Sequence, residues 1–296
     1  MEELQIADIP DSLKSDIVRR LAEYSVGFLR LEDTPHGQDA SLLGSGTLAV
    51  IGNTFAILTA HHVIHTLPCT GRLGLFLSPT SQPHSLDTQG LTYLKIARGS
   101  DDSVGPDLGA VILAPSIAGT IAAKKTFYNL QLRREHLLHN APESRDGIWF
   151  VHGFVAENTV EKPDTVSGYG FVKFFFSFGG IGRPKSLVQI GDHDYFTIPL
   201  DPAAPPPVPK RFGGMSGGGL WQVPLARDKS GELAHETPLL SGVAFYQHDS
   251  TDSGSALRCH GRASLYGIAY DAIVKTSPMT PAKGCPAISR KDGGLE

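Results

Sequence analysis

The sequence predicts an all-β fold with short helices near its two ends. Most apolar residues fall in short segments such as GTLAVIG, TFAILTA and LGAVILA, and Gly, Pro, Asn or Asp separate these segments. Strands repeated at this spacing indicate an antiparallel barrel or sandwich rather than alternating strands and helices. The chain has 296 residues, of which 41% are hydrophobic, so a sizeable core is available.

A short amphipathic helix is expected near the N-terminus. Residues 11–23, DSLKSDIVRRLAE, begin with Asp11, a residue type that caps helices, and space apolar residues at helical intervals.

The preceding residues are acidic where a signal peptide is basic, so nothing directs export. The longest apolar runs, such as GFVKFFFSF, are too short to span a membrane. We therefore expect a cytoplasmic protein without a membrane partner.

The remaining elements follow in order along the chain. Strands are expected at SVGFLRL, GTLAVIG, TFAILTA, RLGLFLS, TYLKIA, LGAVILA, GIWFVHGFV, GFVKFFFSF, YFTIPL and LLSGVAFYQ. The polar stretch from Lys124 to Ser144, helical around residues 127–139, connects an early and a late group of strands. The proline-rich segment 201–210 is expected as a stiff, extended loop within the late group. The tail from Pro278 onward is expected to be poorly ordered.

Charge and cysteine content exclude several classes of function. The formal net charge is -4 and both signs are mixed along the chain, so no basic footprint for nucleic acid is present. The three cysteines, Cys69, Cys259 and Cys285, are odd in number, scattered, and lack C-x-x-C spacing. We interpret them as reduced thiols, in keeping with a cytoplasmic protein.

The segment RFGGMSGGGLW at 211–221 holds Ser216 among five glycines. An α/β-hydrolase elbow would continue into a helix, which Pro224 obstructs, and its acid and histidine would follow the serine. A phosphate cradle would need a helix and usually a lysine just inside it, and neither is present. Two segments upstream of Ser216 indicate its role better. Two strands joined by a Gly52-Asn53 turn lead into TAHHV, and Asp107 begins the apolar strand DLGAVIL.

The order His, Asp, Ser is that of the chymotrypsin-type triad, and the residue types suit its chemistry. A serine hydroxyl is a weak nucleophile, so it needs an imidazole to take its proton. The imidazole in turn needs a buried carboxylate to fix its tautomer and stabilise its charged form. Glycines beside the serine let backbone N–H groups point at a developing oxyanion.

At these three segments the sequence resembles the trypsin-like (chymotrypsin-fold) serine endopeptidases, over roughly residues 25–275. TAHHV resembles the histidine motif, PDLGAVIL the aspartate motif and GGMSGGGLW the serine motif. The resemblance implies His62 as general base and acid, Asp107 as orienting acid and Ser216 as nucleophile. It also implies an oxyanion hole formed by the N–H groups of Gly214 and Ser216, and no cofactor.

The resemblance further implies two perpendicular, antiparallel, six-stranded β-barrels with the active site between them. The expected boundaries are an N-terminal helical extension over 1–24, a first barrel over 25–125, a connection over 126–145, a second barrel over 146–277 and a tail over 278–296. No region of PDZ size follows the second barrel, which argues against the standard layout of HtrA-type proteases.

Two positions depart from the pattern of the family. Met215 stands where zymogen-type members carry an aspartate that pairs with a newly cut N-terminus, so that ion pair cannot form. Val63 stands where a cysteine commonly follows the histidine. The resemblance is therefore closer to intracellular bacterial members than to digestive enzymes.

Several side chains have competing interpretations. The H-H-x-x-H pattern of His61, His62 and His65 lacks the glutamate of a metalloprotease, so a zinc site is not expected. Asp101 and Asp102 compete with Asp107 but lie in a polar turn. The candidates for a specificity pocket are Lys210, Phe245 and Tyr246. His260 and Arg262 are either residues at its edge or, as is more common for such residues, structural or surface residues. A lysine at the pocket base would favour acidic substrates, whereas a solvated Lys210 would have no such role.

The sequence thus predicts a serine endopeptidase that cuts a protein or peptide substrate through an acyl-enzyme. The alternative is a latent or inactive trypsin-like module that binds or regulates and needs a protein partner.

Overall fold

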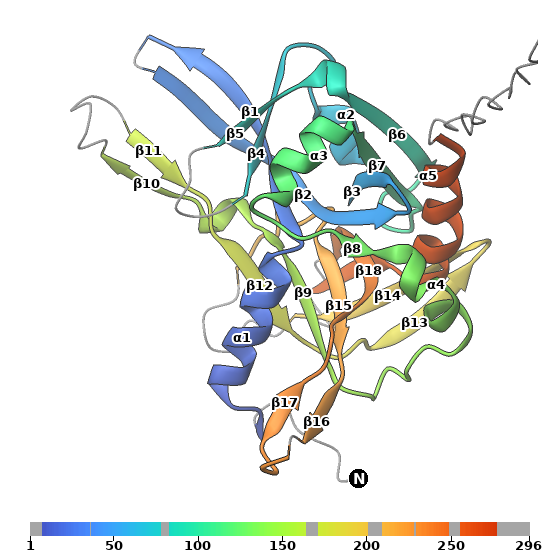
Figure 1. The fold of residues 1–296 in the computed structure, drawn as a ribbon. Coiled ribbons are helices and arrows are strands. Elements are labelled where there is room, and N and C mark those ends of the chain that lie inside the picture. The colour runs from blue at the N-terminus through green and yellow to red at the C-terminus, as the bar shows by residue number, and fades with distance from the viewer. Residues whose placement is uncertain are drawn as a thin grey trace, which may run out of the picture.

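Two large, mainly antiparallel sheets form the body of the protein (Figure 1). The computed structural model describes residues 8–35, 37–77, 83–163, 171–200, 209–227, 229–248 and 255–276. The predicted proline-rich loop, except for Pro209 and Lys210, and the predicted tail lie outside these residues. None of the helices in the described ranges has both the length and the apolar composition needed to cross a bilayer.

The first sheet comes from the N-terminal half of the chain. Its strands are β1 (Ser25–Thr34), β2 (Gly37–Ile51), β3 (Thr54–Thr59), β4 (Arg72–Phe76), β5 (His84–Asp87), β6 (Leu91–Arg98), β7 (Asp107–Leu113) and β8 (Tyr128–Asn129). They lie in the order β5-β4-β1-β2-β3-β7-β6, and β8 pairs with β2. The predicted Gly52-Asn53 turn joins β2 to β3, and Gly52 adopts a φ of +55°, which two-residue hairpins favour.

The second sheet comes from the C-terminal half. Its strands are β9 (Ile148–Phe154), β12 (Ser177–Ile181), β13 (Ser186–Ile190), β14 (His193–Pro199), β15 (Gly219–Val223), β18 (Leu239–His248) and β19 (Ala256–His260). They lie in the order β12-β9-β15-β18-β19-β14-β13. Two small hairpins stand beside it, formed by β10 (Val160–Pro163) with β11 (Phe171–Phe174) and by β16 (Leu225–Arg227) with β17 (Leu233–His235).

The predicted all-β class is confirmed, although both sheets contain more strands than the expected six. The additional strands lack a strong apolar pattern. In β5 only Leu86 is buried, and in β13 every residue after Ser186 is exposed. Hydrogen bonding to a neighbouring strand defines these elements rather than the sequence pattern. The predicted domain boundaries stay a prediction.

The helices are short and lie around the sheets. They are α1 (Asp11–Ala22), α2 (His61–Thr66), α3 (Pro115–Ala122), α4 (Leu130–His139) and α5 (Tyr270–Thr276), with a π-helix, η4 (Ser264–Ala269), before α5 and 3-10 turns η2 (Thr88–Gly90) and η3 (Ala156–Asn158). The predicted helices over 11–23 and around 127–139 are confirmed as α1 and α4. Asp11 is not the cap of α1, because Pro10 occupies that position and the first helical turn contains Asp11.

An aromatic cluster ties the N-terminal helix to the strand that follows the glycine-rich segment. Trp221 on β15 is fully buried, with its ring 5.1 Å from that of Tyr24 and 5.4 Å from that of Tyr128. Burial of one such side chain contributes about 2 kcal/mol, and each aromatic contact adds roughly 1 kcal/mol. The cluster belongs to a core that includes residues of both sheets, so it fixes β15 and the segment before it against the first sheet.

Candidate active site

His62 and Asp107 come together because their strands are neighbours. β3 ends at Thr59, two residues before α2 begins, and Thr59 pairs with Gly109 near the start of β7. The His62 Nδ1–H donates to Asp107 Oδ2 over 2.6 Å, and the His62 backbone N–H donates to Asp107 Oδ1 over 2.9 Å. The carboxylate therefore fixes both the ring and the backbone of the candidate base.

Asp107 is buried, and His62 and Arg98 both contact its carboxylate. Its side chain is 2% exposed, and its Oδ2 also accepts an ion pair from Arg98 Nη1 at 3.1 Å. Burial, the strongest influence, disfavours its charge. The hydrogen bonds and charge of His62 and the charge of Arg98 outweigh burial and hold the pKa of Asp107 below its ordinary value. Asp101 and Asp102 are the alternative candidates for the orienting acid. Asp101 bonds to Ser103, and Asp102 pairs with Arg98 instead of contacting His62.

His260 supports Asp107 from behind. The backbone N–H of Asp107 donates to His260 Nε2 over 3.0 Å, which leaves the ring proton on Nδ1. Burial lowers the pKa of His260 to about 3, so the ring is neutral near pH 7. The side chain of His260 is fully buried, which agrees with the structural interpretation of this residue rather than with a place at a pocket edge.

Ser216 follows a tight turn that glycine makes possible. The Met215 N–H donates to the Phe212 carbonyl over 2.9 Å, and Gly214 adopts a φ of +92°. A turn with positive φ at its third residue favours glycine there. Gly217 has a φ of +95°, and a Cβ atom on it would lie 1.9 Å from the Ser45 carbonyl oxygen. The glycines on both sides of the serine are therefore structurally required.

Ser45 on β2 connects this turn to the first sheet. Its backbone N–H donates to the Ser216 carbonyl over 2.9 Å. Its hydroxyl donates to the Gly214 carbonyl and accepts from the Phe154 N–H, each over 2.7 Å. Ser45 is fully buried, so these bonds are shielded from water. Sequence reasoning missed Ser45, although a serine between two glycines on an apolar strand was a signal that it has a buried partner.

Met215 lies in the core of the second sheet. It is 1% exposed, and a Cβ atom on Gly153 or Gly218 would lie 2.7 Å from its Sδ atom. Apolar packing thus occupies the place where the resemblance puts an aspartate paired with a chain terminus. The turn has its shape without that ion pair.

The Ser216 hydroxyl donates to the Phe245 carbonyl over 3.2 Å. In the described part of the chain it has no hydrogen bond to His62, whose side chain is 41% exposed. The segments that carry the two residues both lie next to Gly44. A Cβ atom on Gly44 would lie 2.8 Å from Val63, which follows His62, and 3.4 Å from the Ser216 carbonyl oxygen.

The predicted specificity residues occupy different environments. Phe245 is buried against Tyr195 and His260, and Tyr246 contacts the ring of His248 at 4.9 Å. The Lys210 side chain is exposed, while its backbone bonds to neighbouring side chains. Arg262 lies away from this group, because its guanidinium donates to Gln222, Ser241 and the Pro142 carbonyl.

The other two histidines of the H-H-x-x-H pattern pack on each other, with ring centroids of His61 and His65 4.7 Å apart. Within the described ranges, no three His, Cys, Asp or Glu side chains form a group that could hold a metal ion. Cys69 and Cys259 are both free thiols.

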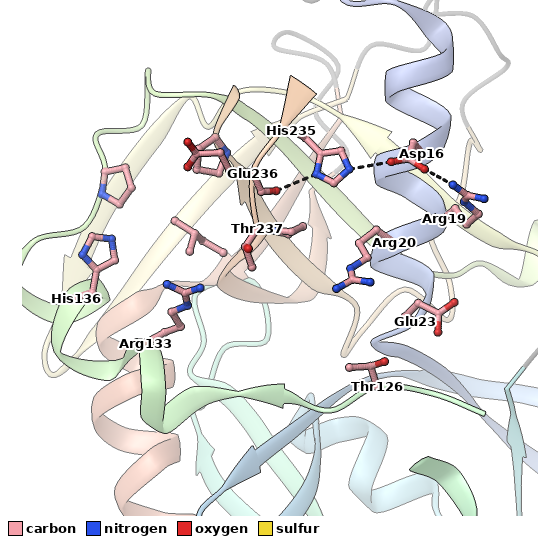
Figure 2. A pocket seen from close by; sticks show the side chains of 14 residues that line it. Asp16, Arg19, Arg20, Glu23, Thr126, Arg133, His136, His235, Glu236 and Thr237 are labelled. Atoms are coloured by element: carbon pink, nitrogen blue, oxygen red, sulfur yellow. Dashed lines mark hydrogen bonds and ion pairs between the residues drawn. The ribbon is translucent and has the colours of Figure 1, made fainter. Parts of the chain in front are cut away.

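A cavity of about 1050 Å³ lies between α1, α4 and the segment after β17 (Figure 2). Its lining includes Arg20 and Arg133, which face it from α1 and α4, and the bonded pair of Asp16 and His235 at 2.8 Å. None of the triad candidates lines this cavity, so it is separate from the candidate active site.

No protein-family model matches the chain, and no curated protein matches its sequence. Two solved structures resemble it in fold. The inactive form of the Ser343Ala mutant of Rv3671c from M. tuberculosis H37Rv is 14% identical with a TM-score of 0.42, over 91% of this chain and 96% of that chain. The HtrA-type protease AlgW with a decapeptide is 14% identical with a TM-score of 0.42, over 88% of this chain and 67% of that chain.

Proposed function

We propose that this protein is a serine endopeptidase with His62, Asp107 and Ser216 as its triad. The observation that carries the proposal is the 2.6 Å hydrogen bond from the His62 ring to a carboxylate that is 2% exposed. In the neutral ring, this bond places the proton on Nδ1 and leaves Nε2 as the atom that can accept a proton. A histidine held in this way, with a serine on a glycine turn beside it, is suited to acyl transfer.

In the proposed reaction, the Ser216 Oγ attacks the carbonyl carbon of the scissile peptide bond while its proton passes to His62 Nε2. The resulting oxyanion accepts hydrogen bonds from the Gly214 and Ser216 N–H groups. The proton then moves to the leaving amine, the C–N bond breaks, and an acyl-enzyme remains. Water, deprotonated by the same Nε2 atom, releases the acid and restores the serine.

The bond from Ser216 to the Phe245 carbonyl must break before attack. When the Ser216 hydroxyl turns from this carbonyl to His62, it exchanges one hydrogen bond for another. The net cost of losing one such bond is on the order of 1 kcal/mol.

The same hydrogen bond favours the alternative, a latent module that waits for a protein partner. In that case, binding would turn Ser216 away from Phe245 and toward His62. A partner can shift this equilibrium only by its difference in affinity for the two states.

Labelling with a fluorophosphonate separates these functions. The active enzyme is expected to form an adduct at Ser216 that the Ser216→Ala variant lacks and that His62→Ala slows. A latent module is expected to label only after addition of cell extract. Absence of a Ser216-dependent adduct under both conditions would reject the peptidase.

The substrate class is a protein or peptide, and profiling with a peptide library tests the role of Lys210. Because the Lys210 side chain is exposed, we expect cleavage without a preference for acidic residues. A preference for acidic residues that Lys210→Ala abolishes would assign this lysine to the specificity pocket.

A further inference from the structure

Arg98 is a cation in direct contact with the candidate triad aspartate. It ends β6 and pairs across the sheet with Asp107, the first residue of β7. Its Nη1 atom lies 3.1 Å from Asp107 Oδ2, the same oxygen that accepts the hydrogen bond from His62. The guanidinium and the imidazole thus share one carboxylate oxygen.

Arg98 also reaches the surface. Its side chain is 35% exposed, and Nη2 forms an ion pair with Asp102, whose side chain is 62% exposed. A buried carboxylate and an exposed one therefore hold the guanidinium from two sides. The two ion pairs fix the orientation of the long Arg98 side chain, which would otherwise adopt several rotamers in water.

The other ionisable groups near this pair contribute less positive charge. Burial lowers the pKa of His61 and, to about 3, that of His260, so both are neutral near pH 7. Four further groups lower the pKa of these two rings through their charge: His65 and Lys95 act on His61, and His193 and Arg258 act on His260. Among the described residues, Arg98 is the permanent cation that contacts Asp107.

We propose that Arg98 is a positioning residue that shares the charge of Asp107 and thereby restrains protonation of His62. This proposal rests on the proposed function, because it concerns the same triad. A carboxylate that is paired with arginine attracts a second cation less strongly than an unpaired carboxylate does. Loss of Arg98 is therefore expected to favour protonation of His62 and to move the acidic limb of the pH–rate profile to higher pH.

The test is an NMR titration of the His62 ring in proteins that also carry Ser216→Ala, so that no catalysis is needed. Arg98→Met is expected to raise the midpoint of this titration by roughly one pH unit. Arg98→Lys keeps the charge and is expected to restore most of the original midpoint. Arg72→Met is the matched control, because Arg72 forms an exposed ion pair with Asp33.

Asp102→Asn gives a second test that leaves the arginine in place. Once released from Asp102, Arg98 is expected to lie closer to Asp107, so the midpoint stays the same or falls. A midpoint in Arg98→Met equal to that in Arg72→Met would overturn the proposal, and so would a rise in Asp102→Asn. These results do not depend on whether the protein cleaves peptides, whereas failure of fluorophosphonate labelling would reject the peptidase alone.

Discussion

Beside the first sheet, His62 at the start of α2 is hydrogen-bonded to Asp107 at the start of β7, and Arg98 adds a full charge to the group. On the second sheet, the turn that carries Ser216 is held by backbone hydrogen bonds and by burial of Met215. The first arrangement depends on protonation, whereas the second depends on shape. Changes of pH and changes of side-chain volume should therefore affect different halves of the site.

Removal of the triad charge is expected to have the largest effect on reactivity. Asp107→Asn preserves the shape of the carboxylate but favours the wrong tautomer of His62, so labelling of Ser216 should slow by about 10⁴-fold. Asp33→Asn, at an exposed ion pair, is the control and should label normally. The measurement is the second-order rate of fluorophosphonate labelling. A loss below tenfold would exclude Asp107 as the orienting acid.

Gly217→Ala tests the turn that carries Ser216 by changing its shape. The new methyl group would collide with the Ser45 carbonyl at a φ unsuited to alanine, so we expect a loss of roughly 3 kcal/mol in the free energy of unfolding. Displacement of the turn should slow labelling about 100-fold. Gly213→Ala is the matched control, because its methyl group would have no neighbour within 4 Å. Equal behaviour of the two variants in urea unfolding and labelling would show that the turn is not rigid.

Ser45→Ala tests the connection between the two halves. It leaves the Gly214 carbonyl and the Phe154 N–H without their buried partner, which should cost about 1–3 kcal/mol of stability. Because Gly214 supplies an expected oxyanion donor, labelling should also slow by about tenfold. Ser41→Ala, at an exposed position on the same strand, should change neither quantity. A variant that loses stability but labels at the original rate would limit Ser45 to a structural role.

The smallest expected effect concerns acid sensitivity on the second sheet. Burial lowers the pKa of His152 to about 3, while an unfolded chain binds this proton near pH 6.5. The unfolded state thus gains protons first, and stability falls as pH drops from about 6.5 toward 3. His152→Gln should show a shallower fall between pH 7 and pH 5 in urea unfolding. His139→Gln, which changes an exposed residue, should follow the original protein, and identical slopes for all three would contradict buried, neutral His152.

The sequence predicts the parts of the site that lie in local motifs. His62, Asp107 and Ser216 each stand at a strand end or turn with a recognisable pattern, and the structure brings His62 and Asp107 into contact. The contact of Arg98 with Asp107 could not be predicted from the sequence, because a register shift between Lys95 and Ala97 aligns the two residues. Such a bulge changes which side chains face each other and leaves no trace in the apolar pattern.

The fold shows the same division. The class and most strands follow from apolar segments and glycine turns, whereas β5 and β13 depend on pairing with neighbours and could not be read from composition. The candidate role of Lys210 in specificity rests on its position six residues before Ser216. A position in the sequence does not establish side-chain direction, and in the structure the Lys210 side chain is exposed, whereas His260 lies buried behind Asp107.

The burial of Met215 has a consequence for timing. A turn shaped by a thioether in the core takes its form as the chain folds, without the ion pair that a newly cut N-terminus supplies in zymogens. For a peptidase, competence would then depend on folding and on release of the Ser216 hydroxyl from the Phe245 carbonyl. Restraint on such an enzyme would come from limited access, limited abundance or a partner that controls this hydroxyl, rather than from an ion pair formed after cleavage.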